Sequence, residues 1–86
     1  MDPYTIIKHP LSTEKSIRLM ESENKLIFVI HKKATKNDVK AAIEQMFKVS
    51  VDTVNTFTTP NGEKRAYVKF SSKNPAIDIA TQMGLM

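Results

Sequence analysis

The chain has 86 residues, of which 41% are hydrophobic, enough for one small globular domain and too many for a disordered chain. It has no cysteine, which excludes disulfides, thiol catalysis and cysteine-based zinc sites and fits a reducing cytoplasm. No apolar run approaches the roughly 18 residues of a membrane span or resembles a signal peptide, so we expect no membrane insertion. No repeat, low-complexity tract or linker interrupts the sequence, so we expect one domain over residues 1–86.

The N-terminal quarter predicts a short strand and then a helix. Residues 4–8 are β-prone, and this segment stops before Pro10. Ser12 is placed to cap a helix over about residues 13–21, with Glu14 in its first turn, where the helix dipole favours an anion. Two apolar residues, three apart, define its expected buried face: Ile17 and Met20.

The middle of the chain predicts a buried strand and a second helix. Asn24 ends the first helix, and residues 26–30 form an apolar run without alternation, which predicts a strand covered on both faces and therefore helices on both faces of the sheet. Thr35 begins the second helix, with Asp38 three residues later as in a capping box. Its expected buried stripe has helical spacing: Val39, Ile43, Met46 and Phe47.

A hairpin follows. Residues 51–59 and 64–70 are typical of strands, and Pro60-Asn61-Gly62 between them predicts a tight turn, since Asn-Gly tolerates positive φ. The second strand alternates, so three of its residues should point inward: Ala66, Val68 and Phe70. Three should point outward: Arg65, Tyr67 and Lys69.

The last element is a helix that starts at Asn74 as N-cap and Pro75 in the first turn, and ends at Gly84. The residues expected to pack it are Ile77, Ala80 and Met83. The order is thus β-α-β-α-β-β-α. It predicts the α+β class, with a mainly antiparallel sheet and helices packed on its faces.

The sequence contains few of the residues and none of the motifs that enzyme catalysis commonly uses. His9 and His31 are the only imidazoles, no metal-binding, nucleophile or phosphate-loop motif is present, and the carboxylates are scattered. We therefore expect no catalytic residue, metal site, cofactor or small-molecule substrate.

The basic residues are better organised. Thirteen Lys and Arg against nine Asp and Glu give a net charge of +4, which favours a polyanionic partner. They fall into three groups, near residues 8–15, 32–40 and 64–69, and each group alone reads equally well as a solvated face. Arg65 can hold a phosphate with two hydrogen bonds, and Tyr67 can either stack on a base or cover the sheet. Asn55 and Thr56 lie mid-strand, where they can bond neighbouring backbone or meet an RNA sugar or phosphate.

Four blocks in this chain resemble the universal large-subunit ribosomal protein twenty-three family, in the family's order and over nearly the whole chain. They are residues 10–16 (P-L-S-T-E-K-S), 34–36 with 39–44 (A-T-K and V-K-A-A-I-E), 47–49 with 54–56 (F-K-V and V-N-T) and 64–68 (K-R-A-Y-V). The short turn at residues 60–62, the terminal helix and the lack of a basic N-terminal extension resemble the archaeal type.

The resemblance implies an α+β domain of the cytoplasmic ribosome. It would bind large-subunit ribosomal RNA beside the polypeptide exit tunnel, next to neighbouring large-subunit ribosomal proteins, and help to dock the signal recognition particle and nascent-chain factors. Glu14 matches a family position implicated in chaperone docking in bacteria, and the expected docking residues are Glu14, Arg18 and Glu21. With the basic groups, the expected RNA-binding residues are Lys8, His9, Ser12, Thr13, Lys15, Lys32, Lys33, Lys36, Lys40, Asn55, Thr56, Lys64, Arg65 and Tyr67.

Three alternatives remain open. An RNA-recognition motif would use residues 26–31 and 65–70 as its central strands, but the glycine-aromatic start is missing and no strand follows the last helix. An acylphosphatase-like enzyme needs an arginine in a phosphate loop, and neither Arg18 nor Arg65 lies in one. A protein-interaction adaptor would differ from an RNA-binding domain by lacking salt-sensitive affinity for RNA.

Overall fold

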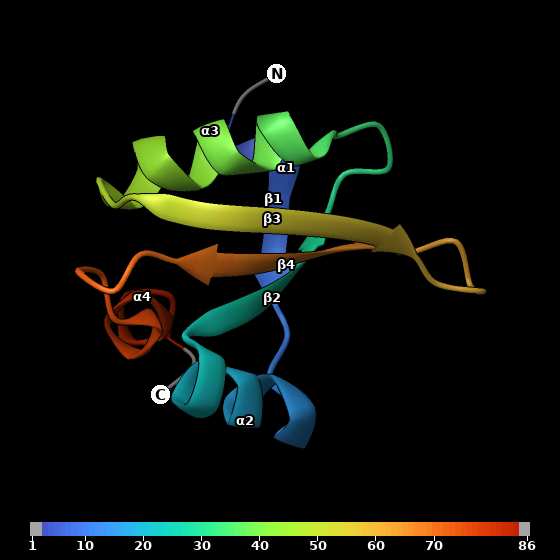
Figure 1. Ribbon diagram of the computed structural model, residues 1–86. Helices are drawn as coiled ribbons and strands as arrows, with labels where there is room; N and C mark the ends of the chain where they lie inside the picture. Colours follow the sequence, from blue (N-terminus) through green and yellow to red (C-terminus); the bar gives the residue numbers. More distant parts are fainter. Residues whose placement is uncertain (1–2, 85–86) are drawn as a thin grey trace.

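The computed structural model describes residues 3–84 and has the predicted order of elements, preceded by one additional short helix (Figure 1). The elements are α1 (Pro3–Ile6), β1 (Ile7–Pro10), α2 (Glu14–Glu23), β2 (Lys25–Ile30), α3 (Lys36–Phe47), β3 (Val51–Thr58), β4 (Lys64–Phe70) and α4 (Ala76–Gln82). None of the helices within this part of the chain combines the length and the apolar character that crossing a membrane requires.

The four strands form one antiparallel sheet in the order β1-β2-β4-β3, which confirms the predicted α+β class. β2 and β4 are the two inner strands, and Tyr67 of β4 lies opposite Ile27 of β2 and Asn55 of β3. In the view of Figure 1, α1 and α3 lie above β3, and α2 and α4 lie below β2. β4, whose sequence alternates most regularly, therefore pairs with a neighbouring strand on each side.

β2 is buried on both faces, as its unbroken apolar run predicts. Leu26, Phe28 and Ile30 belong to a single hydrophobic cluster, to which all four helices contribute side chains. We call this the core face of the sheet. Ile27 and Val29 point to the opposite face, yet both are at most 4% exposed. α2 reaches both faces, because its Met20 belongs to the core cluster and its Lys15 lies over the ring of Tyr67.

The N-terminal segment differs from the prediction. Residues 4–6 belong to a helical turn rather than to a strand, and β1 runs from Ile7 through Pro10 instead of stopping before the proline. Proline is compatible with both places where it occurs. Its fixed φ suits the first turn of α1 at Pro3, and at Pro10 it ends an edge strand, where a missing N–H costs little.

α2 begins one residue later than predicted. Thr13, not Ser12, is the N-cap, and its hydroxyl and that of Ser16 accept hydrogen bonds from each other's backbone N–H at 3.2 and 2.9 Å. The buried face of α2 accordingly carries Ser16 and Met20. The expectation that Ile17 turns inward is wrong, because its side chain is 40% exposed.

α3 follows the prediction closely. Thr35 caps it in a reciprocal capping box with Asp38, and Val39 and Ile43 are fully buried. Met46 and Phe47 are half-buried and pack against the core. The hairpin is also confirmed, with Gly62 at φ +84 in the turn.

α4 has a different start from the predicted one. Its N-cap is Pro75, and Asn74 instead accepts a hydrogen bond from the N–H of Ser50 at 2.9 Å. Ile77 was expected to pack this helix but is 47% exposed, and Ile79 is buried in its place. The remaining expectations for this helix hold: Ala80 is buried, Met83 packs against the core, and Gly84 follows the helix end at φ +78.

Candidate nucleic-acid interface

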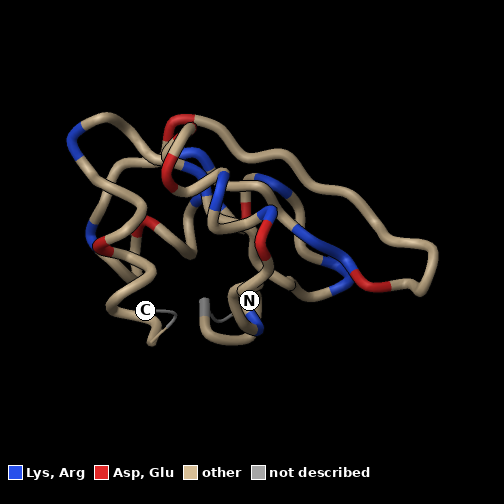
Figure 2. The backbone as a smooth tube through the Cα atoms, turned by 90° about the horizontal axis from the view of Figure 1, so that it is seen from below, with Lys and Arg blue, Asp and Glu red and all other residues tan. Residues whose placement is uncertain are grey.

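Figure 2 shows that Lys and Arg are spread over several parts of the backbone. The residues expected to bind RNA likewise lie on several elements of the fold and not in one block. Two surfaces bring together those that are distant in sequence. One is the face of the sheet opposite the core, called here the outer face. Its exposed and half-exposed side chains on β3 and β4 are Thr53, Asn55, Phe57, Arg65, Tyr67 and Lys69. The other surface is a pocket at one end of the sheet.

The outer face is organised around Tyr67. The Nζ atom of Lys15, from α2, lies 5.6 Å from the centre of the Tyr67 ring, a cation–π arrangement. Phe57 meets Tyr67 with its ring centre 5.1 Å away and an interplanar angle of 78°, which is an edge-to-face contact. The side chain of Phe57 remains 39% exposed. Of the two interpretations of Tyr67, this arrangement favours covering the sheet, because the ring already has two neighbours.

Sequence reasoning missed Phe57. The signal was present, since Phe57 is two residues from Asn55 and strand alternation places both on one face. The register confirms this by setting Phe57 opposite Arg65 and Asn55 opposite Tyr67. Thr56 lies on the core face opposite Ala66 and is half-buried, so Asn55 and Thr56 do not form one polar surface.

Arg65 is positioned by the hairpin. Its Nε donates a hydrogen bond of 2.6 Å to Oε1 of Glu63, two residues earlier and at the end of the turn. This contact fixes the guanidinium in a half-exposed place on the outer face and leaves its two terminal nitrogens without a hydrogen-bond partner among residues 3–84. Lys69 lies four residues further along β4, opposite Lys25 of β2, so positive charge is found at both ends of the outer face.

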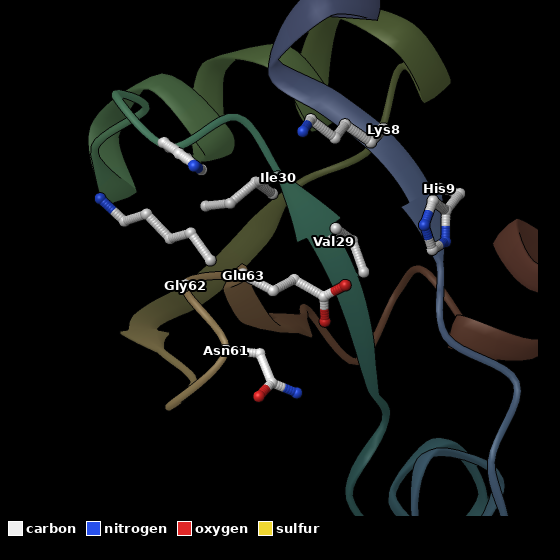
Figure 3. Close-up of a pocket in the computed structure, with 9 residues that line it drawn as sticks. Lys8, His9, Val29, Ile30, Asn61, Gly62 and Glu63 are labelled. Carbon is white, nitrogen blue, oxygen red and sulfur yellow. The ribbon is translucent and has the colours of Figure 1, made fainter.

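The second surface, the sheet-end pocket, has a volume of about 280 Å³ (Figure 3). β1, the end of β2 and the hairpin turn all contribute to its walls. It is lined by Lys8, His9, Val29, Ile30, Lys32, Asn61, Gly62, Glu63 and Lys64. Three lysines here face one carboxylate, a balance that suits an anionic ligand such as a phosphate group.

Lys64 lies on the core face with Ala66, because adjacent strand residues point to opposite faces and its neighbour Arg65 lies on the outer face. Its ammonium group donates a hydrogen bond of 2.6 Å to the carbonyl of Ala34. Lys64 therefore connects the hairpin to the segment before α3 and also lines the pocket.

The other predicted residues lie around these two surfaces. Lys33 is exposed in the turn after β2, next to Lys32 of the pocket, and Lys36 and Lys40 are exposed one helical turn apart at the start of α3. Ser12 and Thr13 are exposed before α2, although Thr13 already serves as its cap. His31 is half-buried, and its Nδ1 accepts a hydrogen bond from the N–H of Lys33 at 3.1 Å, which gives it a structural role.

The three residues expected to dock factors form an exposed strip on α2. Glu14 and Arg18 make an i,i+4 ion pair at 2.5 Å, and Glu21 follows on the same side. Because both partners of the pair are well exposed, it contributes little to stability. Within residues 3–84, no cluster of three His, Cys, Asp or Glu side chains could hold a metal ion.

Known proteins are similar to this chain over nearly its whole length. Residues 5–81 match the family model described as ribosomal protein L23. Large ribosomal subunit protein uL23 is 47% identical to this chain in Methanothermobacter thermautotrophicus, 46% in Methanococcus aeolicus and 44% in Methanococcus vannielii, over 85 residues in each case. Each alignment covers 99% of this chain and 99% of the relative, and all three organisms are archaea.

Proposed function

Because this chain belongs to the ribosomal protein L23 family, we propose that it binds large-subunit ribosomal RNA beside the polypeptide exit tunnel, and that α2 there contributes to docking of the signal recognition particle and nascent-chain factors. At the coarser level the family is a structural protein of the large ribosomal subunit, in the cytoplasmic ribosome. Neighbouring large-subunit ribosomal proteins are its other partners.

The observation that carries the RNA-binding proposal is the sheet-end pocket. Lys8, Lys32 and Lys64 are separated by 24 or more residues in sequence, yet the fold brings all three to one hollow at the end of the sheet. Gathering like charges without a partner is unfavourable, and a phosphate backbone supplies the partner. The half-exposed Arg65 lies beside Lys64 on the hairpin, so the basic surface continues onto the outer face.

Salt dependence tests this proposal. Each phosphate contact should contribute about −0.7 to −0.9 to the slope of log affinity against log salt concentration. With isolated large-subunit ribosomal RNA as the probe, the double substitution Lys32→Gln and Lys33→Gln should flatten the slope by about 1.4 to 1.8. Lys64 is left unchanged in this experiment, because its bond to Ala34 supports the fold.

A matched control is available in Lys48 and Lys73, which are exposed and lie away from the pocket lining. The substitutions Lys48→Gln and Lys73→Gln remove the same net charge, so an effect of charge alone would flatten both slopes equally. A local contact surface flattens only the first. A wild-type slope near zero would contradict the RNA-binding proposal.

Catalysis is not part of the proposed function. The single guanidinium near the pocket, that of Arg65, is bonded to Glu63, and no nucleophile lies beside an activating base in the described part of the chain. We expect no acylphosphate turnover. A reproducible activity that disappears in Arg65→Ala would overturn this expectation.

A further inference from the structure

The outer face of the sheet carries an aromatic side chain that packing inside the domain does not account for. Four large hydrophobic side chains of the described residues are notably exposed, and Phe57 is the one that lies on the sheet. Its neighbours are cationic or polar: Arg65 lies directly opposite, and Asn55 and Tyr67 form the adjacent pair. An exposed ring among cations is an arrangement that recognises nucleotides by stacking.

Resting on the RNA-binding function proposed above, we propose that the outer face binds an unpaired nucleotide of the ribosomal RNA, whose base stacks on Phe57. Arg65 and Lys69 bind the flanking phosphates, and Asn55 donates to or accepts from the edge of the base. The ligand is a single-stranded loop or bulge. A base inside a duplex is already stacked on both sides and offers no ring face to Phe57.

Contacts with neighbouring side chains hold Phe57 and Tyr67 in position on the outer face before a nucleotide binds. The edge-to-face contact with Tyr67 at 5.1 Å holds Phe57 in one place, so little side-chain entropy is lost when a base stacks on it. Tyr67 in turn has the ammonium of Lys15 over its ring, which adds positive charge next to the stacking position. The three elements α2, β3 and β4 therefore contribute one side chain each to a single aromatic and cationic unit.

Asn55 is suited to read a base edge. Its side chain is exposed and has no hydrogen-bond partner among residues 3–84, so its carbonyl oxygen and its two N–H donors remain available. Arg65 retains its terminal nitrogens for a phosphate, because only Nε is bonded to Glu63. The outer face thus offers stacking, hydrogen bonding and charge within one short stretch of two strands.

The charge of this face favours RNA over a protein partner. Lys15, Lys69 and Arg65 surround the aromatic pair, whereas Glu63 is the acidic residue bonded there, to Arg65. A protein ligand would need a strongly acidic surface of its own. Binding of a protein through Phe57 with no effect on RNA affinity would therefore overturn the proposal.

The test uses two RNA probes with nearly equal numbers of phosphates: a single-stranded adenosine RNA of about twenty nucleotides and a blunt duplex whose two strands are half that length. Phe57→Leu should weaken binding to the single strand about tenfold, within the range for loss of one base–aromatic stack. It should leave duplex affinity and the salt slope unchanged, since no charge is removed. Ile77→Ala is the control, because Ile77 is also an exposed apolar side chain but lies on α4, away from the outer face, and it should leave both affinities unchanged.

A second variant gives a direct signal. The chain contains no tryptophan, so Phe57→Trp introduces a single fluorescent indole at the stacking position. It should bind the single strand at least as tightly as the wild type, and the RNA should quench its fluorescence. This variant also keeps the test informative if Phe57→Leu unfolds, which a thermal melt will show.

The two proposals fail in different ways. Equal single-strand affinities for the wild type and Phe57→Leu, or an equal loss on both probes, would overturn base stacking, while a steep salt slope would leave the RNA-binding function standing. No salt-dependent affinity of the wild type for large-subunit ribosomal RNA would instead remove the RNA-binding function itself.

Discussion

Asn24 joins the end of α2 to the start of α4. Its backbone has φ +57 at the C-cap of α2, and its Nδ2 donates to the carbonyls of Phe70, Ser71 and Asn74, each at 3.2 Å. Its Oδ1 accepts from the N–H of Ala76 at 2.6 Å, which supplies the side-chain cap that Pro75 cannot give to α4. The side-chain amide of this one residue thereby bonds backbone groups of β4, of the loop that follows it and of α4.

Replacing Asn24 should separate its two roles. Asn24→Gly retains the left-handed backbone but removes the hydrogen bonds, and we expect a loss of about 1–3 kcal/mol in the free energy of unfolding. Asn24→Ala adds the cost of positive φ, a further ~1 kcal/mol. Urea denaturation measures both. Lys48→Gly is the control at the other C-cap with φ +57, and it should be neutral or stabilising, since no side-chain bond is lost there.

Asp38 gives the domain a pH dependence. The hydrogen bond from the backbone N–H of Thr35, 3.0 Å long, lowers the pKa of the Asp38 carboxyl below its usual 3.8. Because the folded pKa is lower than the unfolded one, this contribution to stability is present above about pH 4 and is lost as the pH falls through the folded value. Asp38→Asn keeps an acceptor but cannot titrate, so stability curves measured from pH 6 to pH 2 should fall less steeply for the variant.

At the residue scale, local capping was predictable and long-range capping was not. Thr35 and Asp38 are three residues apart, and their mutual bonding follows from spacing alone. Asn24 and Ala76 are 52 residues apart, and nothing in the local sequence of either connects them. Phe57 was missed for another reason: strand alternation put it beside Asn55, but an apolar residue in a strand is read first as core.

α2 shows how a buried polar residue can mislead a prediction from apolar spacing. Ile17 and Met20, three residues apart, predicted the inward face, whereas the buried residues are Ser16 and Met20, and the Ser16 hydroxyl donates to the carbonyl of Leu11 at 2.8 Å. A buried serine satisfied by local backbone gives no hydrophobic signal in the sequence. The strands were predicted better, because Ala66, Val68 and Phe70 alternate without a break and the turn at Gly62 fixes their partner.

The exposed strip of α2 allows a test of factor docking that is separate from the tests of RNA binding. Glu14→Ala should weaken recruitment of the signal recognition particle to ribosomes while incorporation of the protein into ribosomes is unchanged. If Glu14 only complements the helix dipole, the change costs some 0.3–1 kcal/mol of stability and recruitment is unaffected. Cosedimentation of the particle with ribosomes that carry the variant measures the first effect, and a thermal melt the second.

Asp78 is the matched control for Glu14, because it is also an exposed acid in the first turn of a helix, α4. Asp78→Ala should cost similar stability and leave recruitment intact. Equal recruitment by both variants would end the docking role of Glu14. A probe attached at residue 18 adds a second check, since crosslinks to ribosomal RNA alone would place this face of α2 inward.

The whole domain is small, with a Cα radius of gyration of 11.6 Å, and its basic surfaces repel one another when unpaired. We expect only modest stability for the free protein and a gain on binding RNA. A ligand specific for the folded state adds about 2.7 kcal/mol at a hundredfold excess over Kd. Thermal melts with and without saturating large-subunit ribosomal RNA should therefore differ by several degrees, and coincident melts would refute the coupling.

The strand order β1-β2-β4-β3 also governs how the domain is made. β2, whose side chains are buried on both faces, is synthesised early, but the inner strand β4 that pairs with it begins 34 residues after β2 ends. At about 5–20 residues per second, translation leaves this apolar strand without β4 for roughly 2–7 s. Vectorial synthesis thus cannot complete the sheet gradually, and nascent chains that end before residue 64 lack the strand on which both β2 and β3 pair.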